Sequence, residues 1–226
     1  MTLTKYGFKE WGLAFIINGV LIALCWLFLS KYSMAATWIL TVFFTIVFLA
    51  IAAFFRNPSR HIPTNINFLV SPADGTVRDI EVVEDFDQSP FKGEALRIGI
   101  FLSVLNVHVN RSCADFQVES VNYRKGEYLD ARHAECAKRN EAMTIAGTAT
   151  MGDKNFPMAI RQISGAIARR IVCPVQAGAK LKKGQLYGMI KFGSRTEIYL
   201  PKDQFDLKVK IGDKVRGGET IIAEIK

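Results

Sequence analysis

Two long apolar runs near the N-terminus constrain this chain more than any other feature. The first extends from Trp11 to Ser30, with Asn18 as its strongly polar residue, and the second extends from Ala35 to Phe55. Each run has about 20 residues, enough as a helix to cross roughly 30 Å of hydrocarbon. Because the connector is short, the two helices would be antiparallel. The pattern predicts a membrane hairpin in residues 1–55 and a separate domain in residues 56–226.

Positive side chains flank the hairpin at both of its ends. Lys5 and Lys9 precede the first run, and Arg56 and Arg60 follow the second. Since positive flanks stay on the cytoplasmic side, the sequence predicts an inner-membrane protein whose following domain faces the cytoplasm. Two alternatives stay open: a helical hairpin buried in a soluble core, and a hairpin that dips into one leaflet.

Composition narrows the class of partner. The formal net charge of +8 favours an anionic partner, such as a nucleic acid, a membrane surface or an acidic substrate. The chain lacks the aromatic and basic motifs of nucleic-acid binding, so we expect no nucleic-acid partner. The cysteines are scattered without a CxxC pair, which predicts neither a disulfide framework nor a metal site and fits a reducing compartment. They are Cys25, Cys113, Cys136 and Cys173.

Beyond the hairpin, strand patterns dominate the sequence. In Val70–Val77, the pair Asp74–Gly75 between two apolar runs indicates a β-hairpin. The polar segment Leu129–Glu141, which carries His133, indicates a loop or a short helix. Short runs of strand-forming residues predict further strands. They occupy Arg97–Leu102, Val107–Arg111, Met158–Val172 and Thr196–Leu200.

An internal repeat occurs near the C-terminus. Gly178–Gln185 matches Gly212–Glu219, and each copy places glycines at turns and then leads into a strand. This pattern resembles the hammerhead turns of biotinyl and lipoyl carrier domains, which are flattened β-sandwiches. We therefore expect a mainly β, barrel-sandwich-like domain behind the membrane hairpin. Because the copies flank Gly193–Ser194, this pair should lie on the β-hairpin that joins them.

Gly193 and Ser194 have the chemistry for a reaction of the chain with itself. Glycine leaves its carbonyl open to close approach, and the hydroxyl of the next residue is an intramolecular nucleophile. An N-to-O acyl shift between them is one interpretation. An ordinary Gly-Ser turn is the other.

Other candidate residues are polar groups near predicted strands. Alternation places His108 and Asn110 on one face, followed by Arg111, and a histidine near neutral pKa suits proton transfer. The alternative is a histidine that is simply packed. Asp74 before a glycine is by default a turn residue. Arg169 and Arg170 are by default solvated charges, but arginines near a membrane also bind lipid phosphate.

Several motifs occur together in one order along nearly the whole chain. They are Phe54–Pro58, Val70–Gly75, Phe101–Ser103 with Asn106–Arg111, Asn140–Glu141, Arg161–Gly165 with Ala168–Val172, and Phe192–Arg195. In these motifs the chain resembles phosphatidylserine decarboxylase proenzymes of the short type with two membrane helices.

The resemblance implies a self-processing enzyme. It implies cleavage between Gly193 and Ser194 into a β chain of residues 1–193 and an α chain of residues 194–226, with Ser194 converted to a pyruvoyl cofactor. A Schiff base on that group then decarboxylates phosphatidylserine to phosphatidylethanolamine and CO2, in phospholipid biosynthesis and without a metal. Ser194, His108 and Asp74 would be catalytic. Asn110, Arg111, Arg169 and Arg170 would contact the anionic phospholipid.

One residue departs from the pattern. Longer relatives carry two histidines three residues apart in this strand, and Arg111 stands at the second position here. His108 would therefore serve decarboxylation, maturation or both. The alternatives to this function are the same chemistry on an archaeal-type ether lipid, and a non-enzymatic membrane adaptor with a lipoyl-like domain. A homo-oligomer is also open.

Overall fold

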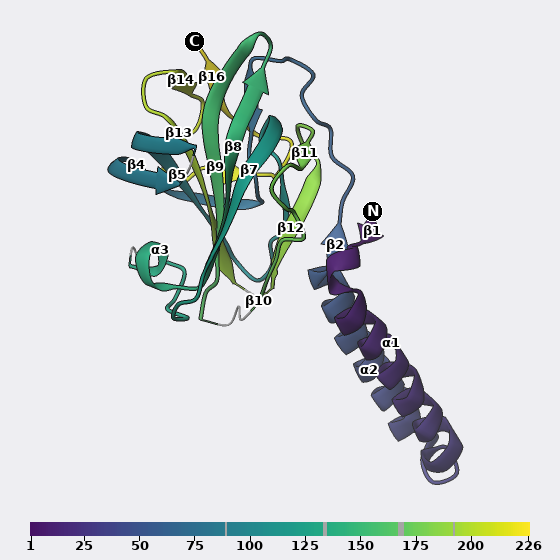
Figure 1. The fold of residues 1–226 in the computed structure, drawn as a ribbon. Helices are drawn as coiled ribbons and strands as arrows, with labels where there is room; N and C mark the ends of the chain where they lie inside the picture. The colour runs from purple at the N-terminus through teal and green to yellow at the C-terminus, as the bar shows by residue number, and fades with distance from the viewer. Residues whose placement is uncertain (89, 133–134, 167–169, 192) are drawn as a thin grey trace. The chain divides into compact units, whose positions relative to one another are not determined.

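The structure is a computed structural model that describes residues 1–88, 90–132, 135–166, 170–191 and 193–226. The chain forms two compact units, Met1–Ser59 and Arg60–Lys226 (Figure 1). Each unit is described by itself below.

The first unit is a helical hairpin. A 3-10 turn (Lys5–Gly7) leads into α1 (Phe8–Leu24), which continues as a π-helical turn (Cys25–Leu29), and α2 (Met34–Phe54) returns. The Ser33 hydroxyl caps α2 by accepting a hydrogen bond from the Ala36 N–H. Two short strands, β1 (Thr2–Leu3) and β2 (Arg56–Asn57), pair at the open end of the hairpin.

The helices of this unit are apolar and largely exposed. Aromatic rings hold them together, with the centroids of Phe15 and Phe48 5.6 Å apart and those of Trp26 and Trp38 5.2 Å apart. Both helices are long and apolar enough to cross a membrane, and little of either apolar stretch is buried by protein. A helix in a soluble core would bury its apolar face, so the exposure indicates membrane association instead.

The second unit is built from antiparallel strands. Its elements are β3 (Phe68–Val70), β4 (Gly75–Gln88), β5 (Phe91–Leu102), β6 (Val109–Arg111), β7 (Asp115–Arg124), α3 (Cys136–Arg139), β8 (Ala142–Met151), β9 (Lys154–Ile163), β10 (Arg170–Val172), β11 (Lys180–Leu181), β12 (Leu186–Lys191), β13 (Ser194–Pro201), β14 (Phe205–Leu207), β15 (Lys214–Val215) and β16 (Ile221–Ile225). Strands make up 44% of the chain and helices 23%, so the predicted mainly β fold with an N-terminal helical hairpin is confirmed.

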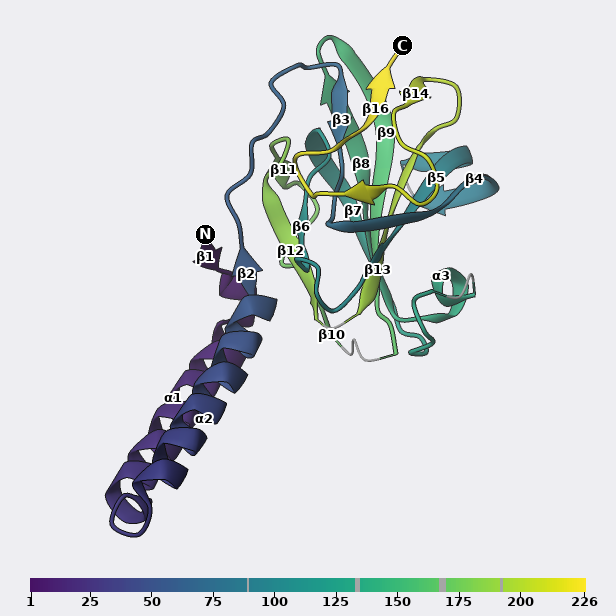
Figure 2. The same cartoon turned by 180° about the vertical axis from the view of Figure 1, so that it is seen from behind.

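One large sheet and two small sheets enclose the core. The large sheet is curled and has the order β11-β7-β8-β9-β13-β5-β4-β15, while the small sheets have the orders β10-β12-β6 and β14-β16-β3. Figure 2 shows β14 and β16 at the opposite end of this unit from β10. The inward side chains of β5 and β13, including Ile98, Ile100, Leu102, Ile198 and Leu200, are fully buried in the core cluster.

The two copies of the repeat occupy equivalent places. The first copy supplies β11 and leads into β12, and the second supplies β15 and leads into β16. The short strands β11 and β15 close opposite edges of the large sheet, and the longer strands β12 and β16 are the middle strands of the two small sheets. This duplicated pair of a short edge strand and a longer strand is the structural basis of the resemblance to carrier domains.

Two predicted β-hairpins are wrong. β3 and β4, on either side of Asp74, belong to different sheets, and so do β12 and β13, on either side of Gly193. At Gly75 an added Cβ would lie 2.2 Å from the carbonyl oxygen of Phe101, so this glycine permits close approach of β4 to β5. Both glycine turns therefore mark crossings between sheets.

Candidate active site

The pair Gly193–Ser194 lies where the chain crosses from a small sheet to the large one. Gly193 has a φ of +61°, the left-handed region that favours glycine. Ser194 begins β13 and pairs with Leu102 of β5. Because β13 has β5 on one side and β9 on the other, the serine side of this peptide is fixed by two ladders.

The Ser194 hydroxyl is buried and unsatisfied. Ser194 is 0% exposed, and its Oγ has no hydrogen-bond partner among the described residues. Leaving a buried hydroxyl unpaired costs about 1–3 kcal/mol, so such groups are rare unless they have another role. The hydroxyl is therefore available to react.

His108 faces the same pair from the turn before β6. Its Nε2 is 3.3 Å from the Gly193 nitrogen, and its Nδ1 is 2.9 Å from the Asn106 carbonyl oxygen. The Gly193 N–H must donate, so Nε2 is the acceptor and Nδ1 carries the proton that goes to Asn106. Asn106 is itself held by Ser103, whose N–H and hydroxyl both donate to Asn106 Oδ1 at 2.8 Å.

A buried polar chain lies under Ser194. Thr196, two residues farther along β13, accepts a hydrogen bond from Asn110 Nδ2 at 3.0 Å, and Asn110 Oδ1 accepts one from Gln162 Nε2 at 2.8 Å. All three residues are at most 1% exposed. Asn110 thus positions β13 beside the serine. Gln162 was not expected as a site residue, because only the sheet topology brings it to Asn110.

Gly165 makes room for the Gly193 carbonyl group. A Cβ added at Gly165 would lie 2.3 Å from the Gly193 carbonyl oxygen. The segment is anchored by Asn140, whose Nδ2 donates to the Ser164 carbonyl oxygen at 2.7 Å. The two motifs Asn140–Glu141 and Arg161–Gly165 therefore meet at the carbonyl that Ser194 would attack.

Asp74 is engaged elsewhere. Both of its carboxylate oxygens lie 2.8 Å from Arg60 Nη2, and its Oδ1 accepts the Gly217 N–H at 2.8 Å. A cavity of about 370 Å³ is lined by both Asp74 and Asn106. Asp74 thus shares a cavity with the turn that holds His108, and its described hydrogen bonds do not include His108 or Ser194.

The arginines proposed from sequence are dispersed. Arg111 donates to the Gly184 carbonyl oxygen at 3.0 Å, and burial first, then the charge of Arg60, lowers the pKa of Arg111. Arg170 begins β10, pairs with Lys191 and is exposed. Arg169, His133 and Phe192 lie outside the described residues.

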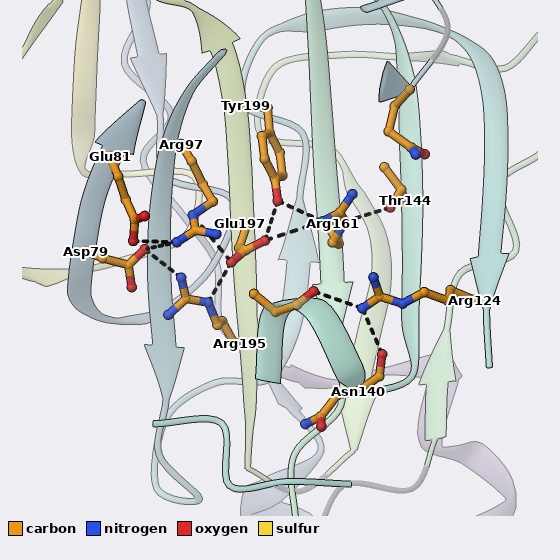
Figure 3. A network of polar contacts seen from close by, with 12 residues as sticks. Asp79, Glu81, Arg97, Arg124, Asn140, Thr144, Arg161, Arg195, Glu197 and Tyr199 are labelled. Atoms are coloured by element: carbon orange, nitrogen blue, oxygen red, sulfur yellow. Dashed lines mark hydrogen bonds and ion pairs between the residues drawn. The ribbon is translucent and has the colours of Figure 1, made fainter. Parts of the chain in front are cut away.

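A network of buried charges lies on the other face of β13 (Figure 3). Arg195 donates to Glu197 at 2.8 Å and to Asp79 at 2.6 Å, while Tyr199 donates to Glu197 at 2.6 Å. Burial alone would lower the pKa of Arg195, but Asp79 and Glu197 outweigh burial and raise it, so the guanidinium stays charged. Arg161 donates to the Tyr199 hydroxyl at 2.9 Å. Arg161 and Arg195 belong to motifs already noted in the sequence, but the sequence did not indicate this network, because only the assembled sheet brings its members together.

A cavity reaches Gly193 from outside. Its volume is about 430 Å³, and Gly193, Arg78, Phe101, Val104 and Ala131 are among its lining residues. Gly193 is the member of the pair that lines this cavity, and Ser194 lies buried directly behind it in the sequence. Within the described part of the chain, no group of three or more His, Cys, Asp or Glu side chains is arranged to hold a metal ion.

Comparison with known proteins identifies the family. Residues 47–223 match the model of the family described as phosphatidylserine decarboxylase. The chain belongs to the phosphatidylserine decarboxylase family. The expected enzyme class, a decarboxylase, is thereby confirmed, and the non-enzymatic adaptor is not supported.

Individual relatives agree with this assignment, and each is named phosphatidylserine decarboxylase proenzyme. The protein of Carboxydothermus hydrogenoformans is 48% identical over 184 residues, which cover 80% of this chain and 82% of that protein. The protein of Rhodopirellula baltica is 43% identical over 188 residues, covering 82% and 76%. The protein of Neisseria gonorrhoeae is 40% identical over 189 residues, covering 83% and 67%.

Proposed function

We propose that this chain is a proenzyme that cuts itself between Gly193 and Ser194 and then converts phosphatidylserine to phosphatidylethanolamine and CO2. The observation that carries the proposal is the buried Ser194 hydroxyl, which lacks a hydrogen-bond partner among the described residues and directly follows the Gly193 carbonyl. The names of the relatives support the same substrate and the same maturation for this chain. The activity belongs to phospholipid biosynthesis.

In the proposed cut, Ser194 Oγ attacks the Gly193 carbonyl carbon. The peptide C–N bond breaks, the nitrogen takes up the hydroxyl proton, and an ester now joins the two residues through Oγ. Removal of the α-proton of residue 194 breaks the Cβ–Oγ bond and releases the Gly193 carboxylate. Hydrolysis of the dehydroalanine expels ammonia and leaves a pyruvoyl group. The products are a β chain of residues 1–193 and an α chain of residues 194–226.

The surroundings of Ser194 fit a pyruvoyl group. The group derives from Ser194 itself, whose hydroxyl is unpaired, and β13 would hold it at the buried start of the α chain. Asn110 fixes that start from one face through Thr196, and Arg195 fixes it from the other through Asp79. The pyruvoyl group supplies an electrophilic carbonyl that accepts the electron pair when CO2 leaves.

His108 is the proposed proton carrier. In the uncut chain its Nε2 holds the Gly193 N–H, which orients the carbonyl group next to Ser194. The cut frees the Gly193 end of the β chain, so Nε2 can turn to the substrate. There Nε2 first takes up a proton from water, and the resulting imidazolium delivers that proton to the carbon that loses CO2, while the Asn106 carbonyl keeps Nδ1 protonated.

Asp74 is proposed to act on maturation from a distance. Asp74 and Asn106 line the same cavity, and the Asn106 carbonyl fixes the tautomer of His108. Asp74 would therefore influence His108 through the turn that contains Asn106. Neither Arg111 nor Arg170 lines the cavity that reaches Gly193. Their contact with the substrate is therefore not supported by this cavity and stays a prediction.

The experiment that tests this function uses the full chain purified in detergent. Denaturing mass spectrometry should show two polypeptides divided at Gly193/Ser194, and vesicle phosphatidylserine should lose CO2. An ether-linked serine phospholipid in the same assay distinguishes the ester-lipid substrate from the archaeal-type alternative. A single 25.3 kDa chain that releases no CO2 would contradict the proposal.

Gly165→Ala is expected to slow the cut about 100-fold, because the methyl group would collide with the Gly193 carbonyl and misplacing a reacting group by about 1 Å costs that much. The cut fraction of pulse-labelled chain measures the effect. Gly19→Ala is the control, since a Cβ there meets no atom within 4 Å. A Gly165→Ala chain that folds by circular dichroism and cuts at the normal rate would remove Gly165 from the mechanism.

We also propose that the hairpin holds the enzyme in the inner cell membrane with its catalytic unit on the cytoplasmic side. The support is the pair of exposed apolar helices together with the positive residues that flank them in the sequence. Lys5 and Lys9 stand at the start of the first helix, and Arg56 and Arg60 follow the second. Protease added to sealed right-side-out vesicles should leave residues 60–226 intact, and detergent should make them cleavable. Digestion in sealed vesicles would reverse the topology.

A further inference from the structure

The cavity that reaches Gly193 contains an arginine that the mechanism above does not use. Arg78 lies at a bulge of β4, where the register with β5 shifts between Val77 and Asp79. Bulges re-aim side chains, and here Arg78 is exposed and lines the cavity together with Gly193. Its guanidinium lies 5.4 Å from the centroid of the Phe101 ring, which fixes its direction.

Arg78 differs from the arginines around it in its partners. Arg132, which also lines the cavity, is paired with Asp130. Arg195 is paired with Asp79 and Glu197. Within the described residues, Arg78 has no ion pair with a carboxylate. Among the described residues that line this cavity, Arg78 is therefore the cation whose charge is available for an anionic ligand.

The proposed substrate offers Arg78 two anionic groups, a carboxylate and a phosphate. A cation that paired with the carboxylate would stabilise the charge that must disperse as CO2 leaves, and it would oppose the reaction. The phosphate keeps its charge throughout the reaction, so binding it costs no catalytic rate. Arginine also matches phosphate geometry with two parallel donors. The chemistry therefore favours the phosphate.

Apolar residues at the cavity fit the rest of a lipid. Val104 lines the cavity and is 48% exposed, and the next residue, Leu105, is 82% exposed. Both lie on the short turn that also contains Ser103 and Asn106, so their backbone is held in place. An apolar tip beside a cation matches the boundary between the headgroup and the acyl chains of a phospholipid.

We infer that this cavity is the phospholipid headgroup subsite, with Arg78 binding the phosphate and Val104 and Leu105 contacting the glycerol and the start of the acyl chains. The inference rests on the proposed function and adds the residue that selects for a phospholipid. Because the phosphate is bound equally in the ground state and the transition state, Arg78 acts on KM and not on kcat.

The test compares Arg78→Ala with Arg78→Lys and with Lys92→Ala in detergent micelles of varied phosphatidylserine mole fraction. Lys92→Ala is the matched control, because it also removes one positive charge. Lys92 lies on β5, pairs with Asp87 and has a side chain that is 69% exposed. Arg78→Ala should mature normally, raise KM about 10- to 100-fold and leave kcat within about twofold. Arg78→Lys should lie between Arg78→Ala and wild type, and Lys92→Ala should match wild type.

Phosphatidylethanolamine separates the two anionic groups, since it keeps the phosphate and lacks the carboxylate. Its inhibition of the wild-type enzyme should weaken in Arg78→Ala by the same factor as KM rises. Unchanged inhibition with a raised KM would assign Arg78 to the carboxylate and overturn the inference. So would an unchanged KM in cut Arg78→Ala enzyme. If wild-type enzyme itself fails to decarboxylate phosphatidylserine, the proposed function fails instead.

Discussion

Ser194→Ala is expected to remain one uncut polypeptide of 25.3 kDa and to have no decarboxylase activity. The variant removes the oxygen that attacks the Gly193 carbonyl and, with it, the atom that later leaves to form the pyruvoyl group. The fold should persist, because the lost hydroxyl makes no hydrogen bond with the described residues and the smaller side chain stays buried in β13. Relief of that unpaired hydroxyl should even raise the free energy of unfolding slightly.

The measurement is the denatured mass together with CO2 release from labelled phosphatidylserine. Ser112→Ala is a matched control, since Ser112 is also fully buried but its hydroxyl donates to the Ala114 carbonyl oxygen at 2.7 Å. It should lose about 1 kcal/mol of stability and still be cut. A Ser194→Ala chain that appears as two pieces, or that decarboxylates at the wild-type rate, would contradict both the cleavage site and the cofactor.

Local patterns in the sequence predicted the parts of the fold that depend on local physics. Two runs of about 20 apolar residues need no tertiary partner to be recognised as helices that suit a bilayer. The strand from Thr196 to Leu200 appears as β13, and the segment Leu129–Glu141 contains the short helix α3. The turn glycines of the repeat mark the short strands β11 and β15.

Strand pairing was the part that local patterns did not provide. Asp74–Gly75 has the local signature of a hairpin, but β3 pairs with β16, which is far along the chain, and β4 pairs with the following strand, β5. Likewise Ser194 pairs with Leu102 and not with β12. Pairing depends on which apolar faces meet in the core, and a dipeptide does not encode that.

The same limit explains which site residues were found. His108 and Ser194 were recognisable because their own chemistry is distinctive. Gly165 and Gln162 act through contacts with Gly193 and Asn110, and only the assembled sheets make those contacts. Arg78 showed no motif at all, since its role depends on a bulge in β4.

The charge network on β13 would hold the start of the α chain in place after the proposed cut. After the cut, the covalent link at Gly193 no longer holds the start of the α chain. The ladders to β5 and β9 remain, and Arg195 still binds Asp79 and Glu197 in a buried setting where an unpaired charge would be very costly (Figure 3). Residue 194 therefore keeps its position when the peptide bond next to it is lost.

His108→Ala is expected to be cut, more slowly than wild type, and to lose decarboxylation at least about 100-fold per pyruvoyl group. The nucleophile remains in this variant, but Gly193 loses the acceptor that orients it and the substrate loses its proton donor. Positioned proton transfer is typically worth about 10²–10⁴-fold, which sets the size of the loss. Pyruvoyl content and CO2 release are measured on the same sample, so that incomplete maturation is not counted as lost catalysis.

His108→Gln separates the two roles of this histidine. A glutamine oxygen can accept the Gly193 N–H in place of Nε2, which is 3.3 Å away in the native chain, but it cannot deliver a proton. We therefore expect His108→Gln to restore the rate of the cut and to leave decarboxylation as low as in His108→Ala. If glutamine restored both, His108 would be a positioning residue for Gly193 alone. A normal rate per pyruvoyl group in His108→Ala would remove it from decarboxylation and leave the proton to another group in the cavity.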